Sequence, residues 1–243
     1  WIYKQYDSQV QANTVFKPGE SDAAVIRLRE QNEKNKNKVF SGVAASVDCN
    51  SRWVSLDPFR GTIAAVAESA RNVSCVGAEP VAITNNLNFS SPETEIGYWQ
   101  LFSSCNAISE ACTVLETPVT GGNVSLYNES KNKYNEITPI NPTPVIGMVG
   151  KLNNVEKAVS SKWKNNDDQI WLIGSHKSET TIAASSYLEY FHGEITGRPP
   201  KIDVLDEKFC QGFLRNAILN SFVVSSHDIS DGGLAIALAE CCI

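Results

Sequence analysis

The chain has 243 residues and is 42% hydrophobic, so it is long enough to form one large domain or two ordinary domains around a substantial core. Its formal net charge of -6 removes the long-range attraction that nucleic-acid binders use, and the sequence contains no basic patch interleaved with aromatic residues. No apolar run approaches the roughly 20 residues that span a bilayer. We therefore expect a globular protein with neither nucleic acid nor a membrane as its partner.

The cysteines and the ends of the chain indicate its compartment and its extent. The seven cysteines form no C-x-x-C pair, and most lie in apolar or helix-like sequence, which is typical of reduced core thiols in a cytosolic protein. The only methionine is Met148, and the chain stops inside an apolar helical run without a capping signal. We expect an excerpt from a longer polypeptide.

The first part of the chain alternates strands with helices. In chain order, the apolar periodicity predicts strands at residues 22–28 and 39–48, a helix over residues 61–75, a strand at residues 81–84, a helix opened by Ser91 and Pro92 and closed by Pro118, and a buried strand at residues 144–150. The polar run at residues 31–38 is expected to be a solvated hairpin tip. The polar segment at residues 129–136 is expected to be an insert.

A polar, lysine-rich stretch at residues 151–168 indicates a surface connection, which gives predicted domains at residues 1–152 and 153–243. Beyond it the pattern predicts a strand at residues 169–174, helices at about residues 179–192 and 204–219, a strand at residues 222–226, and a final helix after Gly233. Asp203 is the predicted N-cap of the second of these helices, and Gly193 is predicted to end the first.

The segment from Thr117 to Asn128 joins two glycines to small polar residues between apolar segments. Gly121 and Gly122 permit a phosphate to approach the backbone closely, and successive backbone N–H groups can bind an anion. The Asn123 side chain offers an oxygen to a hard cation such as Mg2+, and the Ser125 hydroxyl can contact a substrate or phosphate oxygen. The alternative is a glycine hairpin turn that only links two strands.

Acidic and amide side chains gather at the ends of other predicted elements. Glu68 and Asn72 lie four residues apart on one helix, so they project from one face and can share a cation. Asp22 begins a strand, and Asp228 and Asp231 lie in a loop before the final helix, where ligands of hard cations often gather. The alternative for Glu68 and Asn72 is an ordinary helix surface.

The loop at residues 227–233 precedes a helix N-terminus, which favours anions, and its acidic residues favour a metal-bridged phosphate over a bare one. We expect His227 to be structural more often than catalytic. The asparagines in residues 83–89 suit hydrogen bonds to a base or ribose, although asparagine-rich turns are also ordinary. Together these residues predict a two-domain protein that binds ATP or another nucleotide phosphate with Mg2+.

Several motifs follow one another along essentially the whole chain: Tyr6 to Gln11, Ala65 to Asn72, Gly77 to Pro80, Asn86 to Phe89, Thr120 to Tyr127, Pro142 to Gly150, and His227 to Leu234. Through them the chain resembles the large-subunit family of phosphoribosylformylglycinamidine synthases, of the small bacterial and plastid type. It resembles the second half of that subunit, and each half is similar to aminoimidazole ribonucleotide synthetase. The resemblance implies an α+β fold, in which an αβ sandwich pairs with its twin half through strands and is followed by an incomplete α+β domain.

The resemblance also implies a reaction of purine synthesis in the cytoplasm or plastid stroma. ATP activates the amide oxygen of formylglycinamide ribonucleotide as an iminophosphate, and ammonia displaces the phosphate. Positioning and neutralising the transferred phosphoryl group is the main physical demand. The implied partners are the first half of the subunit, a glutaminase subunit that supplies ammonia, and a small accessory subunit.

The site residues that the resemblance implies form two sets. In the first, Asn85 and Gly122 contact ATP, Asn123 binds Mg2+ and Ser125 contacts the substrate. Asn85 stands where many family members carry an aspartate, so only a hydrogen bond is retained there. In the larger single-chain relatives a second set holds a structural nucleotide with Mg2+, at positions matching Asp22, Asp228 and Ser230 for the nucleotide and Glu68 and Asn72 for the metal. No residue is implied as an acid or base, because the family's catalytic histidines belong to the first half.

Two alternatives remain open. One is another ATP-dependent enzyme of the same superfamily, such as a selenophosphate synthetase or a thiamine monophosphate kinase-like protein. The other is a nucleotide-binding half that scaffolds assembly without chemistry.

Overall fold

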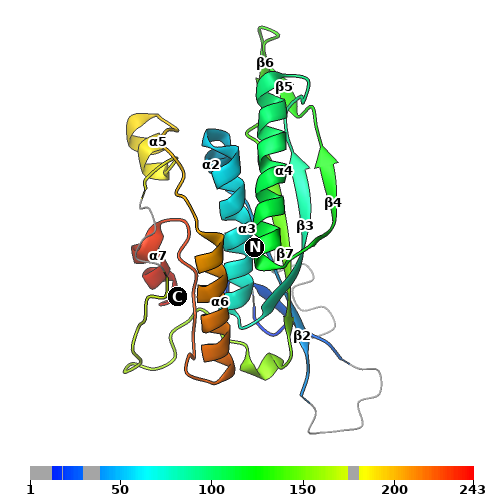
Figure 1. Ribbon diagram of the computed structural model, residues 1–243. Helices are drawn as coiled ribbons and strands as arrows, with labels where there is room; N and C mark the ends of the chain where they lie inside the picture. The colour runs from blue at the N-terminus through cyan, green and yellow to red at the C-terminus, as the bar shows by residue number, and fades with distance from the viewer. Residues whose placement is uncertain (1–12, 18, 30–38, 175–180) are drawn as a thin grey trace.

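A five-stranded mixed sheet with helices packed on one face forms the body of the computed structural model, which describes residues 13–17, 19–29, 39–174 and 181–243 (Figure 1). The strand order is β1 (Ala24–Arg27), β2 (Gly42–Asp48), β7 (Thr143–Leu152), β3 (Glu79–Asn88) and β4 (Val119–Ser125). All neighbours are antiparallel except β3 and β4, which are parallel. Parallel strands need a crossover connection, and α4 (Glu95–Leu115) provides it.

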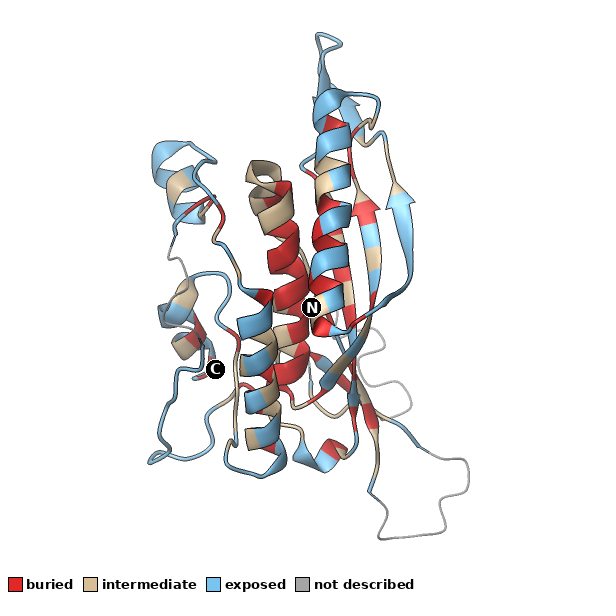
Figure 2. Cartoon of the chain, viewed as in Figure 1, coloured by how far each residue is buried: buried red, intermediate tan, exposed pale blue. Residues whose placement is uncertain are grey.

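The helix α3 (Pro58–Cys75) lies at the centre of the core (Figure 2). It packs against β2, β7, α4 and α6 (Val204–Leu219), and its small residues Ala64, Ala67 and Ala70 are buried among these elements. A helix that is covered on several sides needs small side chains where its neighbours approach closely. The side chain of Asp57 caps this helix by accepting a hydrogen bond from the Arg60 backbone N–H at 3.0 Å.

Gly150 permits the close contact between β7 and α3. A Cβ atom at Gly150 would lie 2.2 Å from Cγ1 of Val73, which is fully buried on α3. Because real Cβ atoms do not approach that closely, a larger residue at position 150 would push the helix away from the sheet.

The face of the sheet opposite α3 exposes apolar side chains. Val47 in β2 is 70% exposed and Ile26 in β1 is 49% exposed. Their sheet neighbours Val25, Ala44 and Met148 point to the helices and are fully buried, as the alternation of side chains along a strand requires. An exposed apolar sheet face of this kind is typical of an interaction surface.

The helix α6, together with α5 (Ser186–His192) and α7 (Gly233–Glu240), lies on the outer side of α3 (Figure 1). The short η2 (Val155–Lys157) instead follows β7 and places Val155 beside Gly42 at the start of β2. Leu214 and Ile218 of α6 pack against Cys75 at the end of α3. Asp203 caps α6 and Gly193 ends α5 in the left-handed conformation, so both predicted caps are confirmed. The division into domains at residues 1–152 and 153–243 stays a prediction.

The predicted strands at residues 22–28, 39–48, 81–84 and 144–150 and the helices at residues 61–75, at residues 204–219 and after Gly233 are confirmed. The start of α4 was predicted wrongly. Thr94, rather than Ser91 and Pro92, begins it, because the Thr94 hydroxyl accepts the Gly97 N–H at 3.1 Å and caps the first turn. The predicted hairpin tip at residues 31–38 lies outside the described residues.

The elements that were not predicted include a short helix and a short hairpin. The helix α2 (Ser51–Leu56) precedes α3. The polar segment at residues 129–136 contributes β5 (Glu129–Lys131), which pairs with β6 (Ile137–Pro139) in a two-stranded hairpin. All residues of β5 and β6 are exposed, so the hydrophobic periodicity that identifies strands is missing here.

The strands predicted at residues 169–174 and 222–226 are wrong. The apolar run at residues 169–174 has no regular structure, and Trp171 and Leu172 are 77% and 70% exposed. A strand needs a neighbour to satisfy its backbone, and none of the described strands pairs with this run. Within residues 222–226 there is one isolated parallel bridge, between Ser160 and Ser225. The helix predicted at residues 179–192 is limited, in its described part, to α5.

None of the helices in the described ranges is long and apolar enough to cross a membrane. The seven cysteines are free, and Cys75, Cys112 and Cys241 are buried as expected for core thiols. Cys105 and Cys242 are exposed instead.

Candidate functional site

The glycine-rich segment lies in a strand. Residues Val119–Ser125 form β4 beside the parallel strand β3, so the alternative interpretation of a glycine hairpin turn is wrong. The ladder pairs Asn85 with Gly122, Asn86 with Asn123, and Asn88 with Ser125. We call these six residues the β3–β4 pair. Nucleotides and phosphates commonly bind near the carboxyl ends of parallel strands, which is where this set lies.

Strand alternation divides the β3–β4 pair between the two faces of the sheet. Asn85 is opposite Ile146, which is fully buried under the helices, so Asn85 and its neighbour Gly122 belong to the helix-bearing face. Asn123 and Ser125 therefore belong to the open face. The residues that the resemblance assigns to ATP thus lie on one side of the strands, and those assigned to Mg2+ and substrate lie on the other.

Gly122 packs directly against Asn85. A Cβ atom at position 122 would lie 2.0 Å from the Asn85 side-chain Oδ1 and 2.7 Å from the Asn85 backbone oxygen. The neighbouring Gly121 has no heavy atom within 4 Å of the corresponding position. Position 122 must therefore remain without a side chain if Asn85 is to keep its place, whereas position 121 has open space.

Asn123 is exposed and held by one side-chain hydrogen bond. Its Nδ2 donates to Oδ1 of Asn86 at 3.1 Å, which leaves its own Oδ1 as an acceptor. A single amide oxygen suits a hard cation but supplies only one of the several oxygen ligands that Mg2+ requires. Asn123 thus fits Mg2+ as a single ligand, and a complete site would need further oxygen ligands from other residues.

Ser125 is half-buried and linked to Asn128 beyond the strand. The Nδ2 of Asn128 donates to the Ser125 backbone oxygen at 2.8 Å and to its hydroxyl at 3.1 Å. This linkage orients the hydroxyl at the end of β4 on the open face. The arrangement can present a hydroxyl group to a bound molecule at a fixed position.

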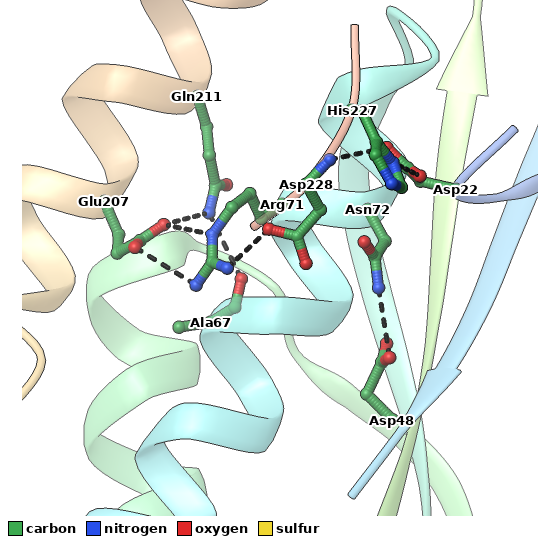
Figure 3. Close-up of polar contacts among 9 residues, drawn as sticks. All are labelled: Asp22, Asp48, Ala67, Arg71, Asn72, Glu207, Gln211, His227 and Asp228. Carbon is green, nitrogen blue, oxygen red and sulfur yellow. Dashed lines mark hydrogen bonds and ion pairs between the residues drawn. The ribbon is translucent and has the colours of Figure 1, made fainter. Parts of the chain in front are cut away.

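A second group of polar residues surrounds Arg71 on α3 (Figure 3). Arg71 donates to Oδ1 of Asp228 at 2.6 Å and forms two bonds of 3.2 Å with the carboxylate of Glu207. Asp228 is 3% exposed. Burial alone would lower the pKa of Arg71, but the two carboxylates outweigh it and raise that pKa, so the guanidinium stays charged. Gln211 supports the pair by donating to Glu207 at 3.1 Å.

His227 links the start of β1 to α7. Its Nδ1 lies 2.5 Å from Oδ1 of Asp22 and its Nε2 lies 3.0 Å from Oε2 of Glu240. Burial lowers the pKa of His227, but the Glu240 hydrogen bond and the Asp22 charge outweigh it and raise that pKa. Burial raises the pKa of Asp22, and His227 offsets part of the effect. Both ring nitrogens are thus engaged within the fold, and the second Asp22 oxygen accepts the Asp228 backbone N–H at 2.9 Å.

The predicted metal ligands Glu68 and Asn72 both interact with a second carboxylate, that of Asp48. Asn72 Nδ2 donates to Oδ1 of Asp48 at 3.0 Å (Figure 3). Burial, followed by the charges of Asp228 and Asp48, raises the pKa of Glu68 to about 7. Burial also raises the pKa of Asp48. Both pKa values are raised because these carboxyl groups are poorly solvated and lie near other negative charges.

The structure brings most of the predicted residues together in two separate places. Asn85, Gly122, Asn123 and Ser125 meet in the β3–β4 pair. Asp22, Asp228, Glu68 and Asn72 meet around Arg71, and with Asp48, Arg71, Glu207, Gln211 and His227 they form what we call the Arg71 cluster. Ser230 is exposed, and its backbone oxygen accepts the Gly233 N–H.

Sequence reasoning missed Arg71, Asp48 and Glu207. Arg71 lies between Glu68 and Asn72 on a helix that is otherwise small and apolar, and that position is a signal that could have identified it. Its partner Asp228 lies 157 residues away, so only the fold brings the two together.

Known proteins match this chain at the level of family and structure. The family model described as AIR synthase related protein, N-terminal domain, matches residues 20–152, which is more than half of the 243 residues. The phosphoribosylformylglycinamidine synthase subunit PurL of Prochlorococcus marinus (strain MIT 9312) is 93% identical over 243 residues, covering 100% of this chain and 31% of that protein. The chain therefore spans about a third of the length of this curated relative.

Solved structures of PurL from Thermotoga maritima are also similar to this chain. The complex with FGAR is 26% identical with a TM-score of 0.62, covering 98% of this chain and 32% of that chain. The complex with ATP is 35% identical with a TM-score of 0.52, covering 65% of this chain and 24% of that chain. The PurLQS structure is 35% identical with a TM-score of 0.52, covering 67% of this chain and 24% of that chain. Together with the mixed sheet and its helices, the family match shows that the chain belongs to the AIR synthase related protein family, through that family's N-terminal domain.

Proposed function

We propose that this chain is part of an ATP-dependent carbon–nitrogen ligase that converts formylglycinamide ribonucleotide, ATP and ammonia to the corresponding amidine in purine biosynthesis. The observation that carries the proposal is the β3–β4 pair, in which parallel strands bring a backbone glycine, an amide oxygen and a hydroxyl to one sheet edge. The 93% identity to a PurL subunit and the similarity to ATP-bound and FGAR-bound PurL support it.

In this proposal four residues of the β3–β4 pair bind or orient a reactant. Gly122 lets ATP approach the backbone, and Asn85 contributes a hydrogen bond in place of a charge. Asn123 contributes one oxygen ligand to Mg2+, which when bound neutralises phosphate charge. Ser125, oriented by Asn128, contacts the ribonucleotide substrate. None of these side chains is well suited to proton transfer at neutral pH, so their role is positioning.

The open face of the sheet is the proposed contact with the first half of the same subunit. Asn123 and Ser125 lie on that face, so a partner packed there would complete their site. We expect residues 1–243 alone to give no turnover with substrate, ATP and ammonia, because this chain supplies only one wall of the site. The glutaminase and the small accessory subunit are proposed partners by the same resemblance, and PurLQS of Thermotoga maritima is consistent with them. We place this ligase in the cytoplasm or plastid stroma.

The Arg71 cluster is the proposed second site, for a structural nucleotide with Mg2+. Asp22, Asp228 and Ser230 would contact the nucleotide, and Glu68 and Asn72 the metal. Oδ2 of Asp48 and Oδ2 of Asp228 are buried and find no hydrogen-bond partner among the described residues, which supports a cation there. Gly232 is the N-cap of α7 and supplies no side-chain cap, which leaves the N–H groups of the first turn beyond Gly233 available for a phosphate.

The second candidate function is that of a scaffold half that carries out no chemistry. The ion pairs of the Arg71 cluster favour this candidate, because they join segments far apart in the chain.

The two candidates are distinguished by Asn123→Ala and Ser125→Ala in the full-length subunit with ammonia as nitrogen source. We expect Asn123→Ala to raise the Mg2+ requirement and Ser125→Ala to raise KM for the ribonucleotide, each by at least tenfold. The matched controls are Asn153→Ala and Ser130→Ala, which remove the same types of side chain at exposed positions. Unchanged activity in Asn123→Ala, together with unfolding of Asp228→Ala, would instead support the scaffold.

A further inference from the structure

Asn86 lies beside Asn123 on the open face of the sheet. The two ladders of β3 place Asn86 opposite Asn123 of β4 on one side and opposite Val145 of β7 on the other. The next residue of β7, Ile146, is fully buried on the helix-bearing face, so Val145 and the residues opposite it belong to the open face. Both asparagines are exposed. Two neighbouring strands thus present one amide each at the same position along the sheet.

Asn86 determines which atom of the Asn123 amide faces away from the strand. The Nδ2 of Asn123 donates to Oδ1 of Asn86 at 3.1 Å. Because the nitrogen of an amide only donates and its oxygen only accepts, this bond directs the Asn123 nitrogen to β3 and turns its oxygen away from Asn86. An exposed asparagine without such a bond can rotate about its last torsion, which exchanges the two atoms. Only the oxygen can bind a hard cation such as Mg2+ or Mn2+.

The backbone that carries Asn86 is held on both sides. Its strand β3 is paired with β4 on one side and with β7 on the other. The Nδ2 of Asn88 donates to the backbone oxygen of Asn86 at 3.2 Å and to the backbone oxygen of Thr143 on β7 at 3.3 Å. A hydrogen bond restricts its donor only where the acceptor has a fixed place. Asn86 therefore offers Asn123 an acceptor at a defined position.

We propose that Asn86 is a positioning residue for cation binding by Asn123: it holds the amide nitrogen of Asn123 so that the amide oxygen faces the metal. This role rests on the proposed function, in which Asn123 binds Mg2+, and it adds a residue to which the resemblance gives no role. One hydrogen bond between neutral groups limits the size of the effect. Its net contribution corresponds to a factor of about three to ten in a binding constant.

The first readout is Mn2+ binding by the full-length subunit, measured by electron paramagnetic resonance of free Mn2+. The component of binding that is lost in Asn123→Ala identifies the site. Asn86→Ala should weaken this component about threefold to tenfold, because the Asn123 oxygen is no longer directed to the metal. Asn86→Asp should retain it, since a carboxylate also accepts the bond from Nδ2 of Asn123. Asn153→Ala is the matched control, since Asn153 is also exposed, and it should leave Mn2+ binding unchanged.

Combined substitutions separate positioning from direct metal binding. Asn86→Ala together with Asn123→Ala should bind Mn2+ no more weakly than Asn123→Ala alone, because Asn86 acts only through Asn123. For the same reason, Asn86→Asp should not restore the lost component when it is combined with Asn123→Ala. Restored binding would mean that position 86 reaches the cation directly, and it would overturn the proposal.

The second readout is the Mg2+ concentration that gives the half-maximal rate with ammonia as nitrogen source. It should rise about threefold to tenfold in Asn86→Ala, while kcat at saturating Mg2+ stays unchanged, a split that a general loss of structure would not produce. Unchanged Mn2+ affinity in Asn86→Ala overturns the role of Asn86 and leaves the proposed function in place. Unchanged Mn2+ binding in Asn123→Ala would instead contradict the proposed role of Asn123, and the role of Asn86 with it.

Discussion

The β3–β4 pair and the Arg71 cluster are built in opposite ways. The β3–β4 pair lies on the edge strand β4 and its neighbour β3, its polar side chains are exposed or half-buried, and its hydrogen bonds join neighbouring strands of the sheet. The Arg71 cluster lies between α3, α6 and the loop before α7, and its charged bonds join residues up to 206 positions apart. The first depends on the sheet for its geometry, whereas the second holds separate segments of the fold together.

This difference implies a division between function and stability. Exposed polar groups on a strand cost little to remove, so the β3–β4 pair can be selected for binding. Buried charges are costly to leave without a partner, so the Arg71 cluster must be satisfied before the chain is stable. We therefore expect substitutions in the first region to change activity and substitutions in the second to change the free energy of unfolding.

The largest expected effect is that of Arg71→Met. Removing the guanidinium leaves the Asp228 carboxylate buried without its partner, which should lower the free energy of unfolding by about 3 to 5 kcal/mol. The measurement is urea unfolding of the full-length subunit, followed by fluorescence. The control is Arg198→Ala, because Arg198 is 73% exposed and lies 4.0 Å from Asp57, and its loss should cost below about 1 kcal/mol. Equal effects of the two substitutions would contradict the proposed division.

The second expected effect is a pH dependence of the free energy of unfolding, caused by Glu68 in the Arg71 cluster. The pKa of Glu68 is raised from 4.5 to about 7, so the folded protein holds a proton that the unfolded chain releases in this range. The contribution of Glu68 to the free energy of unfolding is fully present below about pH 4.5 and is lost as pH rises to about 7. After allowance for solvent screening we expect a loss of about 2 kcal/mol.

Glu68→Gln isolates this pH effect. The pKa values of Asp22, Asp48 and His227 are also raised, but these groups are present in both proteins, so the difference between the two curves reports Glu68 and its coupling to its neighbours. Urea unfolding from pH 4.5 to 7.5 in a chelator should show a steeper decline for the unsubstituted protein than for Glu68→Gln. Parallel curves would show that Glu68 is not coupled to the carboxylates around it.

The smallest expected effect on stability is that of Asn123→Ala. Its side chain is exposed and makes one 3.1 Å hydrogen bond to Asn86, so the free energy of unfolding should change by no more than about 0.5 kcal/mol. The measurement is the same urea unfolding, made on a protein whose activity has already been assayed. A loss comparable to that of Arg71→Met would mean that the β3–β4 pair supports the fold rather than a ligand.

The sequence allowed the prediction of features that depend on neighbouring residues. The apolar spacing on α3 and the Asp203 cap on α6 are local signals, and both elements form where predicted. Gly121 and Gly122 indicated a binding segment at the position of the β3–β4 pair, because small residues between apolar segments suit the close approach of a ligand. The strand that contains it was not recognised, since its residues are almost all exposed and lack alternation.

Features that depend on tertiary contacts were not predictable. The bond between Arg71 and Asp228 joins α3 to a loop 157 residues later, and no local pattern encodes it. The apolar run containing Trp171 has the composition of a strand, but strand formation also requires a neighbour. Asp48 gave no signal of its own, because its partner Asn72 becomes adjacent only when β2 packs on α3.

The most direct test of the central claim compares ATP binding by Gly122→Ala and Gly121→Ala in the full-length subunit. The added methyl group at position 122 would lie 2.0 Å from the Asn85 side chain and 2.7 Å from its backbone oxygen, whereas at position 121 it would meet no heavy atom within 4 Å. If the β3–β4 pair is one wall of the ATP site, the Kd for ATP rises at least tenfold in Gly122→Ala and less than about threefold in Gly121→Ala, a difference of roughly 0.7 kcal/mol or more. Equal Kd values in folded variants would contradict the account.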